Sequence, residues 1–288
     1  MKNLEGKVAV ITGAASGIGK AMAERFARAQ MKLVLVDIEV DALEATAADL
    51  RSQGTDVLTR IVDVADAEAM DALRDAVYDH FGTAHVICNN AGVAAAGKAW
   101  ELTLADWEFT MRPNLWGVIH GIRVFGPRLI EQGEGHFVNT ASMAGLVSMG
   151  NMAPYNVTKY GVVALSETLF EDLRAEGTEV GVSVLCPAFV NTKIWDSQRN
   201  RPAHLQNAPR PEKSAEYEAG HAAMKQIVES GIPAEGVADR VHDAVVNNEL
   251  YILTHSATLP ALEKRIGHIL KGENPTPPGT PIEGLTQP

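Results

Sequence analysis

The stretch VAVITGAASGIGKAMAERFARA, residues 8–29, decides the fold, because a strand, a turn and a helix follow one another within it. It begins with a short apolar run typical of a buried strand and ends with residues typical of a helix. Between them lie Gly13, Gly17 and Gly19. Glycines let the backbone approach a ligand closely, and the N–H groups that begin a helix can bind an anion. We therefore expect the turn to hold a phosphate group or, alternatively, to serve only as a structural tight turn.

The remainder of the chain repeats this alternation of short β-branched runs with stretches rich in alanine, leucine, glutamate and arginine. The expected strands are 7–12, 32–37, 56–62, 84–89, 135–141, 180–186 and 250–253. The expected helices lie near 17–30, 40–53, 66–81, 104–131, 155–177, 234–248 and 257–271. Strands that are apolar on both faces and separated by helices predict an α/β fold. The prediction is a doubly wound Rossmann-type parallel sheet with helices on both faces, in a single domain over residues 1–272.

Two segments depart from the alternation. Residues 188–233 contain four prolines, polar residues and one short helix-like stretch, and they follow directly on an expected strand. An insertion at the carboxyl end of a strand is where a lid over a ligand site is expected. Residues 273–288 are rich in proline and predict a flexible tail.

Composition excludes several classes of function. The formal net charge of −11 argues against a nucleic-acid partner and against an anionic membrane surface. Cys88 and Cys186 lie in apolar strands and are expected to be reduced core thiols, and no cysteine or histidine cluster indicates a metal site. The apolar runs are too short for a signal-peptide core or a spanning helix, so we expect a cytoplasmic protein.

Asp37 ends the second expected strand, 20 residues after Gly17. A carboxylate at that position can accept hydrogen bonds from a ribose diol and would repel a 2′-phosphate. Neither Ser16 nor Ile38, beside the glycine and the aspartate, is a cation that could bind a 2′-phosphate. These residues favour NAD over NADP, although Asp37 could instead only cap the following helix.

Tyr155 and Lys159 stand four residues apart at the start of an expected helix. This spacing puts both side chains on one helix face, about one turn apart. A nearby ammonium favours the phenolate and so lowers the pKa of a tyrosine. We interpret Tyr155 as a general base and acid toward an alcohol, with Lys159 lowering its pKa. Ser142, after the fifth expected strand, is placed to hydrogen-bond the substrate oxygen.

In order and in spacing, these motifs resemble the short-chain dehydrogenase/reductase family, of the short non-extended type. The resemblance rests on TGAASGIG (12–19), NNAG (89–92), Asn114, Ser142 and YNVTK (155–159), and it covers residues 5–192. It implies that Lys159 also holds the nicotinamide ribose and that Asn114 holds a water in a proton relay. Pro113, directly before Asn114, and Ala188, where glycine is usual, depart from the family pattern.

The resemblance and the residues together give a set of expected ligand contacts. Asp63 and Val64 are expected at the adenine, with a helix N-cap as the alternative role of Asp63, and Pro187 and Thr192 at the carboxamide. The expected cofactor residues are Gly13, Ser16, Gly17, Ile18, Gly19, Asp37, Ile38, Asp63, Val64, Asn90, Ala91, Gly92, Tyr155, Lys159, Pro187, Val190 and Thr192. The expected substrate walls are apolar and include Val93, Met143, Met149, Phe189 and Trp195.

The lid carries an excess of positive charge. Its stretch 188–215 holds Lys193, Arg199, Arg201, Arg210 and Lys213, against only Asp196 and Glu212. These cations are expected either to form a solvated surface or to receive an anionic substrate group.

The sequence thus favours an NAD-dependent enzyme that transfers hydride between nicotinamide and a hydrophobic secondary alcohol or ketone. Its C-terminal third is similar to bacterial members that act on bulky, often aromatic alcohols. The alternatives are an NADPH-linked ketoacyl or carbonyl reductase and a non-catalytic dinucleotide-binding regulator. The resemblance also implies a homo-tetramer or homo-dimer, packed through the helices 104–131 and 155–177.

Overall fold

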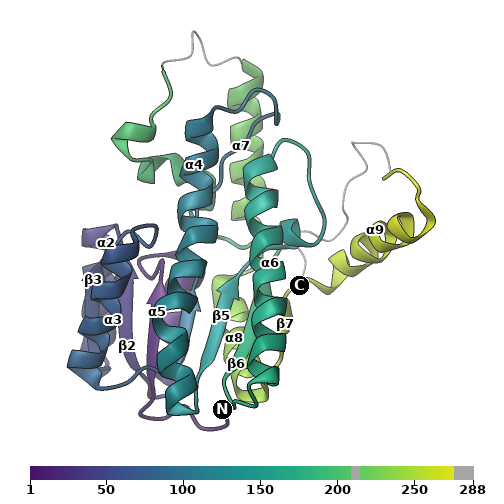
Figure 1. Ribbon diagram of the computed structural model, residues 1–288. Coiled ribbons are helices and arrows are strands. Elements are labelled where there is room, and N and C mark those ends of the chain that lie inside the picture. Colours follow the sequence, from purple (N-terminus) through teal and green to yellow (C-terminus); the bar gives the residue numbers. More distant parts are fainter. Residues whose placement is uncertain (209–214, 276–288) are drawn as a thin grey trace.

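The computed structural model describes residues 1–208 and 215–275, and seven parallel strands form one sheet within them (Figure 1). The strand order is β3–β2–β1–β4–β5–β6–β7, so the chain reverses its direction of winding between β1 and β4. The strands are β1 (Val8–Thr12), β2 (Lys32–Asp37), β3 (Val57–Ile61), β4 (Val86–Asn89), β5 (His136–Thr140), β6 (Gly181–Cys186) and β7 (Tyr251–Leu253). The predicted doubly wound sheet is confirmed, and ligands bind at such a reversal, beyond the carboxyl ends of the strands.

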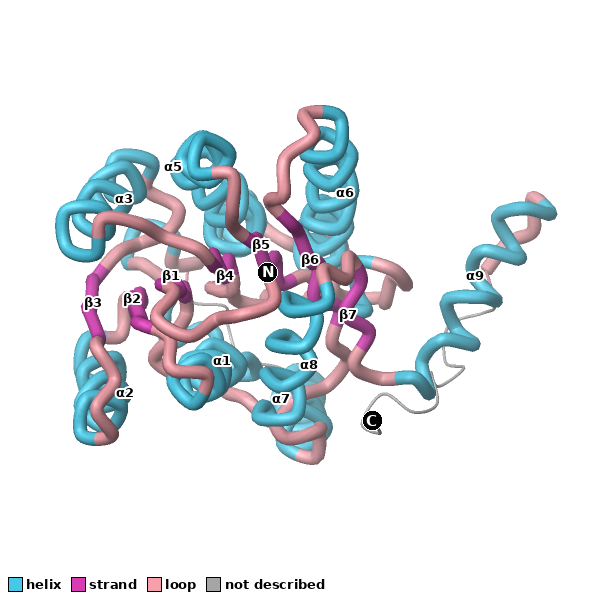
Figure 2. Tube along the Cα trace, turned by 90° about the horizontal axis from the view of Figure 1, so that it is seen from below, coloured by secondary structure: helices cyan, strands magenta, loops and turns pink. Residues whose placement is uncertain are grey.

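Helices cover both faces of the sheet, as Figure 2 shows along the strands. One layer consists of α1 (Gly17–Arg28), α2 (Val40–Ser52) and α8 (Ala234–Asn247), and the other of α3 (Ala67–Phe81), α5 (Gly117–Gln132) and α6 (Ala153–Ala175). Ala9 and Ile11 belong to one buried apolar cluster, whereas Val8 and Val10 belong to the other. Because successive side chains of β1 enter opposite layers, both must be apolar, and the strand shows no alternation of polarity.

The helix expected over 104–131 is divided into three parts, which corrects that prediction. α4 (Leu104–Met111) is followed by a π-helical turn, Arg112–Trp116, and then by α5. Thr103 caps α4 through a capping box with Asp106. Pro113 lies in the π-helical turn, since a proline has no N–H to donate and its ring excludes a regular α-helical turn.

The lid leaves the sheet at the carboxyl end of β6. It forms two short 3₁₀ segments, Ile194–Asn200 and Ala203–Leu205, and then α7 (Ala215–Glu229), which lies near the top of Figure 1. Of the predicted lid charges, Arg210, Glu212 and Lys213 lie outside the described residues. So does most of the predicted tail, namely 276–288.

The last described helix, α9 (Leu259–Lys271), projects away from the body of the molecule (Figures 1 and 2). None of its residues is buried within the described structure. Only its first turn adjoins the sheet, through the short 3₁₀ segment Ser256–Thr258 that follows β7.

Three further observations concern the cysteines, the length of the helices and the grouping of possible metal ligands. Cys88 and Cys186 are both buried and free of disulfides. No described helix has the length and apolar character needed to cross a membrane. Across 1–208 and 215–275, no three His, Cys, Asp or Glu side chains gather in a group that could hold a metal ion.

Candidate active site

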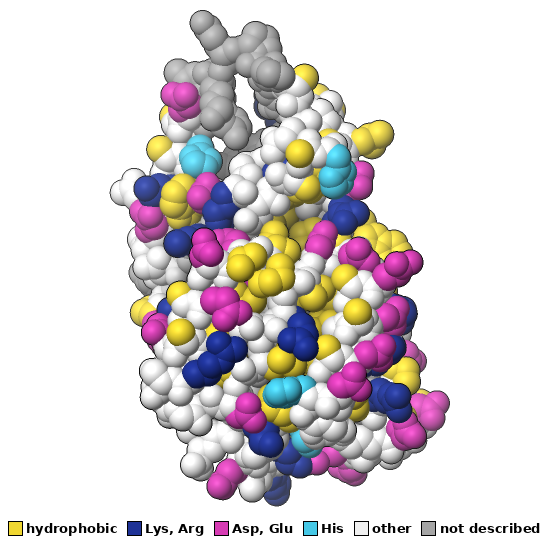
Figure 3. All heavy atoms as spheres, turned by 90° about the vertical axis from the view of Figure 1, so that its left-hand side faces the viewer, with side chains coloured by type: hydrophobic (Ala, Val, Ile, Leu, Met, Phe, Trp, Pro, Cys, Tyr) yellow, Lys and Arg dark blue, Asp and Glu magenta, His cyan; other side chains and the backbone are white. Residues whose placement is uncertain are grey.

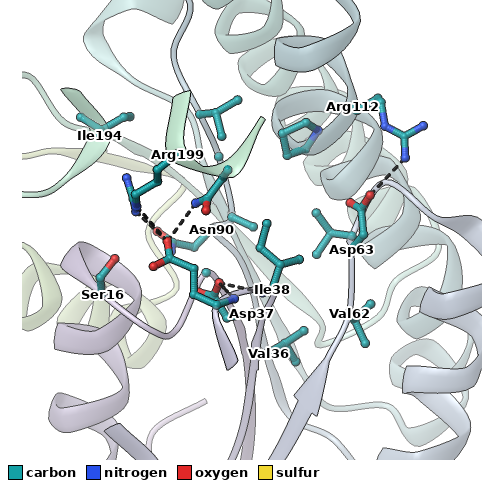
Figure 4. Close-up of a pocket in the computed structure, with 18 of the residues that line it drawn as sticks. Ser16, Val36, Asp37, Ile38, Val62, Asp63, Asn90, Arg112, Ile194 and Arg199 are labelled. Atoms are coloured by element: carbon teal, nitrogen blue, oxygen red, sulfur yellow. Dashed lines mark hydrogen bonds and ion pairs between the residues drawn. The ribbon is translucent and has the colours of Figure 1, made fainter. Parts of the chain in front are cut away.

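A cavity of about 260 Å³ lies at the carboxyl ends of β1 to β4, and the lid forms one of its walls (Figure 4). On the β3 and α2 side of the molecule, apolar side chains gather across the middle of the face, with charged side chains around them (Figure 3). Eleven of the expected cofactor residues line the cavity: Gly13, Ser16, Ile18, Asp37, Ile38, Asp63, Val64, Asn90, Ala91, Gly92 and Thr192.

The glycine turn is shaped by close backbone contacts. Gly13 has φ +68°, and a Cβ there would lie only 2.9 Å from Cα of Ala91. A Cβ on Gly19 would overlap the carbonyl oxygen of Gly13. At the N-cap of α1, Ser16 makes no side-chain cap within the described structure. The N–H groups of the first turn are therefore available to an anion. The structure has the tight turn, whereas phosphate binding by it stays a prediction.

Asp37 receives three backbone hydrogen bonds at the end of β2. Its Oδ1 accepts from the N–H groups of Ile38 (2.7 Å) and Glu39 (3.0 Å), and its Oδ2 accepts from Ala15 (2.9 Å). The carboxylate thus braces the entry to α2 and the glycine turn together. Each carboxylate oxygen can accept two hydrogen bonds, so Oδ2 keeps capacity for a ribose hydroxyl.

Asp63 lies on the opposite side of the same cavity. It accepts from the N–H of Ala65 at 2.9 Å, and its Oδ2 forms an ion pair with Arg112 at 3.1 Å (Figure 4). The N-cap of α3 is Asp66, whose carboxylate accepts from Glu68 and Ala69. The alternative role of Asp63 as an N-cap is therefore wrong, and its pairing with Arg112 was not apparent from the sequence.

A smaller cavity of about 70 Å³ lies beyond β5 and β6. Ser142 and Tyr155 both line it, together with the expected apolar residues Met143, Met149 and Phe189. The wall also includes Ala188 and, from the C-terminal part of the chain, Thr258 and Ala261. Sequence reasoning missed the last two, because they lie in a stretch that carries no recognisable motif. The two polar groups expected to act on an alcohol thus share one mainly apolar cavity.

Lys159 is buried beside this cavity. Its Nζ donates a hydrogen bond to the carbonyl oxygen of Thr140 at 2.7 Å and lies 5.5 Å from the ring centroid of Tyr155. Burial lowers the pKa of Lys159 from 10.5 to about 8, since an ammonium loses its hydration there. Near neutral pH the ammonium is therefore still present, one helical turn from Tyr155.

The pKa of Tyr155 differs in direction from the sequence-based expectation. Burial raises the pKa of the phenol, and a hydrogen bond with Ser142 works against that rise. The protein's own groups thus do not lower this pKa below the usual value of 10, because desolvation disfavours the phenolate. A cationic ring bound nearby would act in the opposite direction to burial.

Asn114 is fully buried in the π-helical turn and fixes the segment after β4. Its Oδ1 accepts from the N–H of Val93 at 2.8 Å, and its Nδ2 donates to the carbonyl oxygen of Val93 at 2.9 Å. A Cβ on Gly92 would lie 3.1 Å from this Oδ1 and 3.7 Å from Nζ of Lys159. The amide and the ammonium therefore flank the same point, and a relay between them stays a prediction.

Four expected contacts are placed differently by the structure. Trp195 packs against α7, where its ring meets His221 and the ammonium of Lys225, because the lid turns its apolar side toward that helix. Val93 lines the larger cavity. Pro187 acts through its carbonyl oxygen, which accepts from Ser142 Oγ and from the N–H of Met143. Val190 is buried in the core and pairs with Ile232.

Arg199 and Arg201, two of the basic lid residues that the structure describes, form specific contacts. Arg201 is 8% exposed and pairs with Asp106 at 2.7 Å, while its guanidinium lies over the ring of Phe109. Arg199 pairs with Glu39 at 2.7 Å. Arg199 and Arg201 therefore form neither a solvated surface nor a free site for an anion. Each makes an ion pair that joins the lid to a wall of the larger cavity.

His255 is a further group that the sequence did not single out. It is fully buried, and its Nδ1 accepts from the N–H of Ala188 at 3.2 Å. Its Nε2 lies 3.1 Å from the carbonyl oxygen of Phe189. With the imidazole neutral, as favoured by the burial that lowers its pKa, one nitrogen accepts and the other donates. His255 thereby fixes the turn where alanine replaces the usual glycine.

Comparison with known proteins agrees with this geometry. The family model described as short chain dehydrogenase matches residues 7–203. A crystal structure of a short-chain dehydrogenase/reductase from Burkholderia phymatum, in complex with NAD, is similar at 44% identity and a TM-score of 0.94, over 98% of this chain and 100% of that one.

Two curated proteins are similar over nearly the whole chain. The CLA biosynthesis dehydrogenase/reductase of Lactiplantibacillus plantarum is 34% identical, over 94% of this chain and 95% of its own. The C alpha-dehydrogenase of Sphingobium sp. is 32% identical, over 96% of this chain and 89% of its own. The resemblance read from the motifs is confirmed: the chain belongs to the short-chain dehydrogenase/reductase family and is an oxidoreductase acting on CH–OH groups.

Proposed function

We propose that the protein is an NAD-dependent oxidoreductase that transfers hydride between nicotinamide and a hydrophobic secondary alcohol or ketone. The observation that carries this proposal is the meeting of Ser142 and Tyr155 on one small apolar cavity, with Lys159 buried beside it. A larger cavity built for an anionic, ribose-bearing ligand adjoins these residues through Gly92.

The larger cavity fits a nicotinamide dinucleotide. The helix start at Ser16 offers N–H groups to a pyrophosphate, and Asp37 keeps an acceptor for a ribose hydroxyl. Apolar side chains such as Ile38 and Val64 offer surface to an adenine ring. A carboxylate at the ribose favours NAD, which is also the cofactor bound in the similar Burkholderia protein.

The chain's own groups would move the proton and hold the substrate oxygen. When bound, the dinucleotide supplies the acceptor or donor of hydride. As the phenolate, Tyr155 takes the hydroxyl proton of the alcohol as the carbon–hydrogen bond breaks, and in the reverse direction the neutral phenol returns that proton to the oxygen. Ser142 donates a hydrogen bond to the same oxygen, and the interaction strengthens as negative charge develops there. Lys159 stabilises the phenolate that forms on Tyr155.

The proposed substrate follows from the walls of the smaller cavity. Methionine, alanine, valine and phenylalanine side chains make up most of the wall, and its polar groups include Ser142, Tyr155 and Thr258. Such a wall suits a secondary alcohol or ketone with apolar substituents.

We also propose that copies of the chain assemble through α4, α5 and α6, which lie side by side on one face (Figure 1). Trp116 and Val157 expose about half of their surface on this face, at 49% and 48%. Burying such apolar area stabilises a homo-dimer or homo-tetramer. Light scattering of the purified chain tests the proposal, and a monomer at micromolar concentration contradicts it.

The decisive experiment is a turnover assay with NAD⁺ and NADP⁺ against aliphatic, cyclic and aryl secondary alcohols, following reduced nicotinamide by absorbance. We expect turnover with NAD⁺ on the apolar alcohols. Turnover only with NADPH and carbonyl substrates would favour the reductase alternative. NAD⁺ binding by calorimetry with silence across the whole panel would favour the non-catalytic regulator.

A further inference from the structure

At the end of the larger cavity where the adenosine is expected, the lid contributes the cation Arg199. Its partner Glu39 lies 160 residues earlier in the chain. Arg199 donates from Nη2 to Oε1 of Glu39 at 2.7 Å and from Nε to the same oxygen at 3.1 Å. Asn200 donates its amide to this oxygen at 2.9 Å. Figure 4 shows Arg199 reaching from the lid toward the wall that carries Ser16, Asp37 and Ile38.

Four of the five N–H groups of the Arg199 guanidinium donate hydrogen bonds within the protein. Besides its two bonds to Glu39, its Nη1 donates to the carbonyl oxygens of Lys193 and Asp196, each at 2.9 Å. Burial tends to raise the pKa of Glu39, but the hydrogen bonds from Asn200 and Arg199 outweigh it, so this pKa lies below its usual value. Glu39 is therefore ionised at neutral pH, and the pair is a stable feature of the wall.

Three charged side chains line this end of the cavity. Asp37 and Glu39 are two carboxylates, and Arg199 is one cation, so the three together carry one negative charge. A ribose 2′-phosphate would add about −1.5 to −2 charges at pH 7. It would meet the charge of Asp37 and would have to compete with Glu39 for Arg199. A ribose hydroxyl meets no such cost.

We propose that Glu39 is a specificity-determining residue for the dinucleotide: by engaging Arg199, it prevents the one lid cation seen at this wall in the described structure from binding a 2′-phosphate. The inference rests on the proposed function, because it assumes that the larger cavity holds the adenosine of a nicotinamide dinucleotide. Asp37 excludes the phosphate by its charge, whereas Glu39 does so mainly by occupying a partner that would otherwise bind it. Arginine forms bidentate hydrogen bonds with phosphate, so its release would create a site.

The test is a double-mutant cycle on Glu39 and Arg199 with two readouts. The first is the ratio of kcat/KM with NADP⁺ to kcat/KM with NAD⁺. The second is the ratio of the Kd values for 5′-ADP and 2′,5′-ADP by calorimetry, which needs no turnover. Glu39→Gln is expected to shift both ratios toward the phosphorylated ligand by about 10- to 100-fold, as for one gained charge-assisted interaction. In the Arg199→Met background, the same substitution should shift them less than about threefold.

Glu44→Gln serves as the matched control, because it removes one carboxylate from the exposed pair with Arg51 on the same helix, α2. We expect both ratios to stay within about twofold of the wild-type values. Glu39→Ala is the second variant, in case the amide of glutamine keeps Arg199 in place, and it should shift the ratios in the same direction.

Two results would overturn the inference. If both ratios are unchanged in both Glu39 variants while 5′-ADP still binds, Glu39 does not contribute to the discrimination between NAD and NADP. An equal shift with and without Arg199 would mean that the charge of Glu39 acts alone. If neither nucleotide binds the wild-type chain, the proposed function itself fails, and this result is distinct from the other two.

Discussion

The two cavities differ in how the chain builds them. The larger is formed mainly by loops that directly follow β1, β2, β3 and β4, and each loop contributes a short contiguous motif. The smaller joins residues from three distant segments, represented by Tyr155, Phe189 and Ala261. The first holds backbone N–H groups and carboxylates, and the second mostly apolar side chains around three hydroxyls. Under the proposed function, cofactor binding and the choice of substrate are thus separated in space and in sequence.

The largest effect on activity is expected from Tyr155→Phe, a substitution that should affect the smaller cavity alone. Tyr155→Phe removes only the hydroxyl that exchanges the proton, so turnover should fall by about 10²–10⁴-fold. The Kd for NAD⁺ should stay within about twofold, because the residues at the adenosine end are untouched. Steady-state kinetics and calorimetry on the same preparation check both statements. Unchanged turnover would remove Tyr155 from the mechanism.

The smaller cavity also adjoins the buried ammonium of Lys159, whose pKa of about 8 has a consequence for stability. Between pH 8 and about pH 10.5, the unfolded chain holds a proton that the folded chain has lost. The free energy of unfolding should therefore rise with pH across this window through this group, and its penalty should be constant below pH 8. At about 1.4 kcal/mol for each unit, the rise totals about 3 kcal/mol.

Urea titrations of wild type and Lys159→Met at pH 7.5, 9 and 10.5 measure this rise as a difference between the two proteins. The free energy of unfolding of the wild type should increase relative to that of the variant as the pH increases. Lys264→Met, on the exposed surface of α9, is the control and should show no such trend. Parallel curves for wild type and Lys159→Met would contradict a lowered pKa.

Gly19→Ala should affect the larger cavity and spare the smaller. The new Cβ would overlap the carbonyl oxygen of Gly13 and press on Asn90, so the phosphate turn must move. Overpacking of this kind costs about 1–3 kcal/mol, and we expect the Kd for NAD⁺ to rise by about 10- to 100-fold. With saturating NAD⁺, kcat should remain within about threefold. Gly236→Ala, in α8 with open space at its Cβ, is the matched control.

The smallest effect is expected from Ala261→Leu, which adds apolar volume to the wall of the smaller cavity. The KM for a bulky alcohol should rise by about tenfold, whereas a compact alcohol and NAD⁺ should be little affected. Kinetics with paired large and small substrates measure the change. Equal effects on both substrates would show that Ala261 does not border the bound alcohol.

Sequence reasoning succeeded where function depends on short stretches of chain. The glycine turn at 12–19 and the pair Tyr155 and Lys159 each lie within one local element, so their spacing alone brings them together. The parallel, doubly wound sheet also follows from the alternation of strands and helices, and seven strands were found within two residues of their expected ends.

The features that were missed depend on contacts between distant segments. The pair of Arg199 and Glu39 joins positions 160 residues apart, and no local pattern indicates it. The π-helical turn at Arg112–Trp116 requires a choice between hydrogen-bonding registers that Pro113 biases but does not specify. Trp195 was assigned to the substrate wall as an apolar residue, yet its ring contacts His221 and Lys225 on α7.

The exposed course of α9 has a consequence for how this scaffold can change. Ala261, near the start of α9, borders the smaller cavity, while no residue of the helix is buried in the described structure. Exchanging residues 259–271 with those of another family member would therefore remove no buried residue, and it would replace the contact of Arg265 with the ring of Tyr160 on α6. Such a chimera would have a new wall in the smaller cavity and an unchanged larger cavity. The helix α9 is therefore a suitable segment to exchange when a different substrate is wanted.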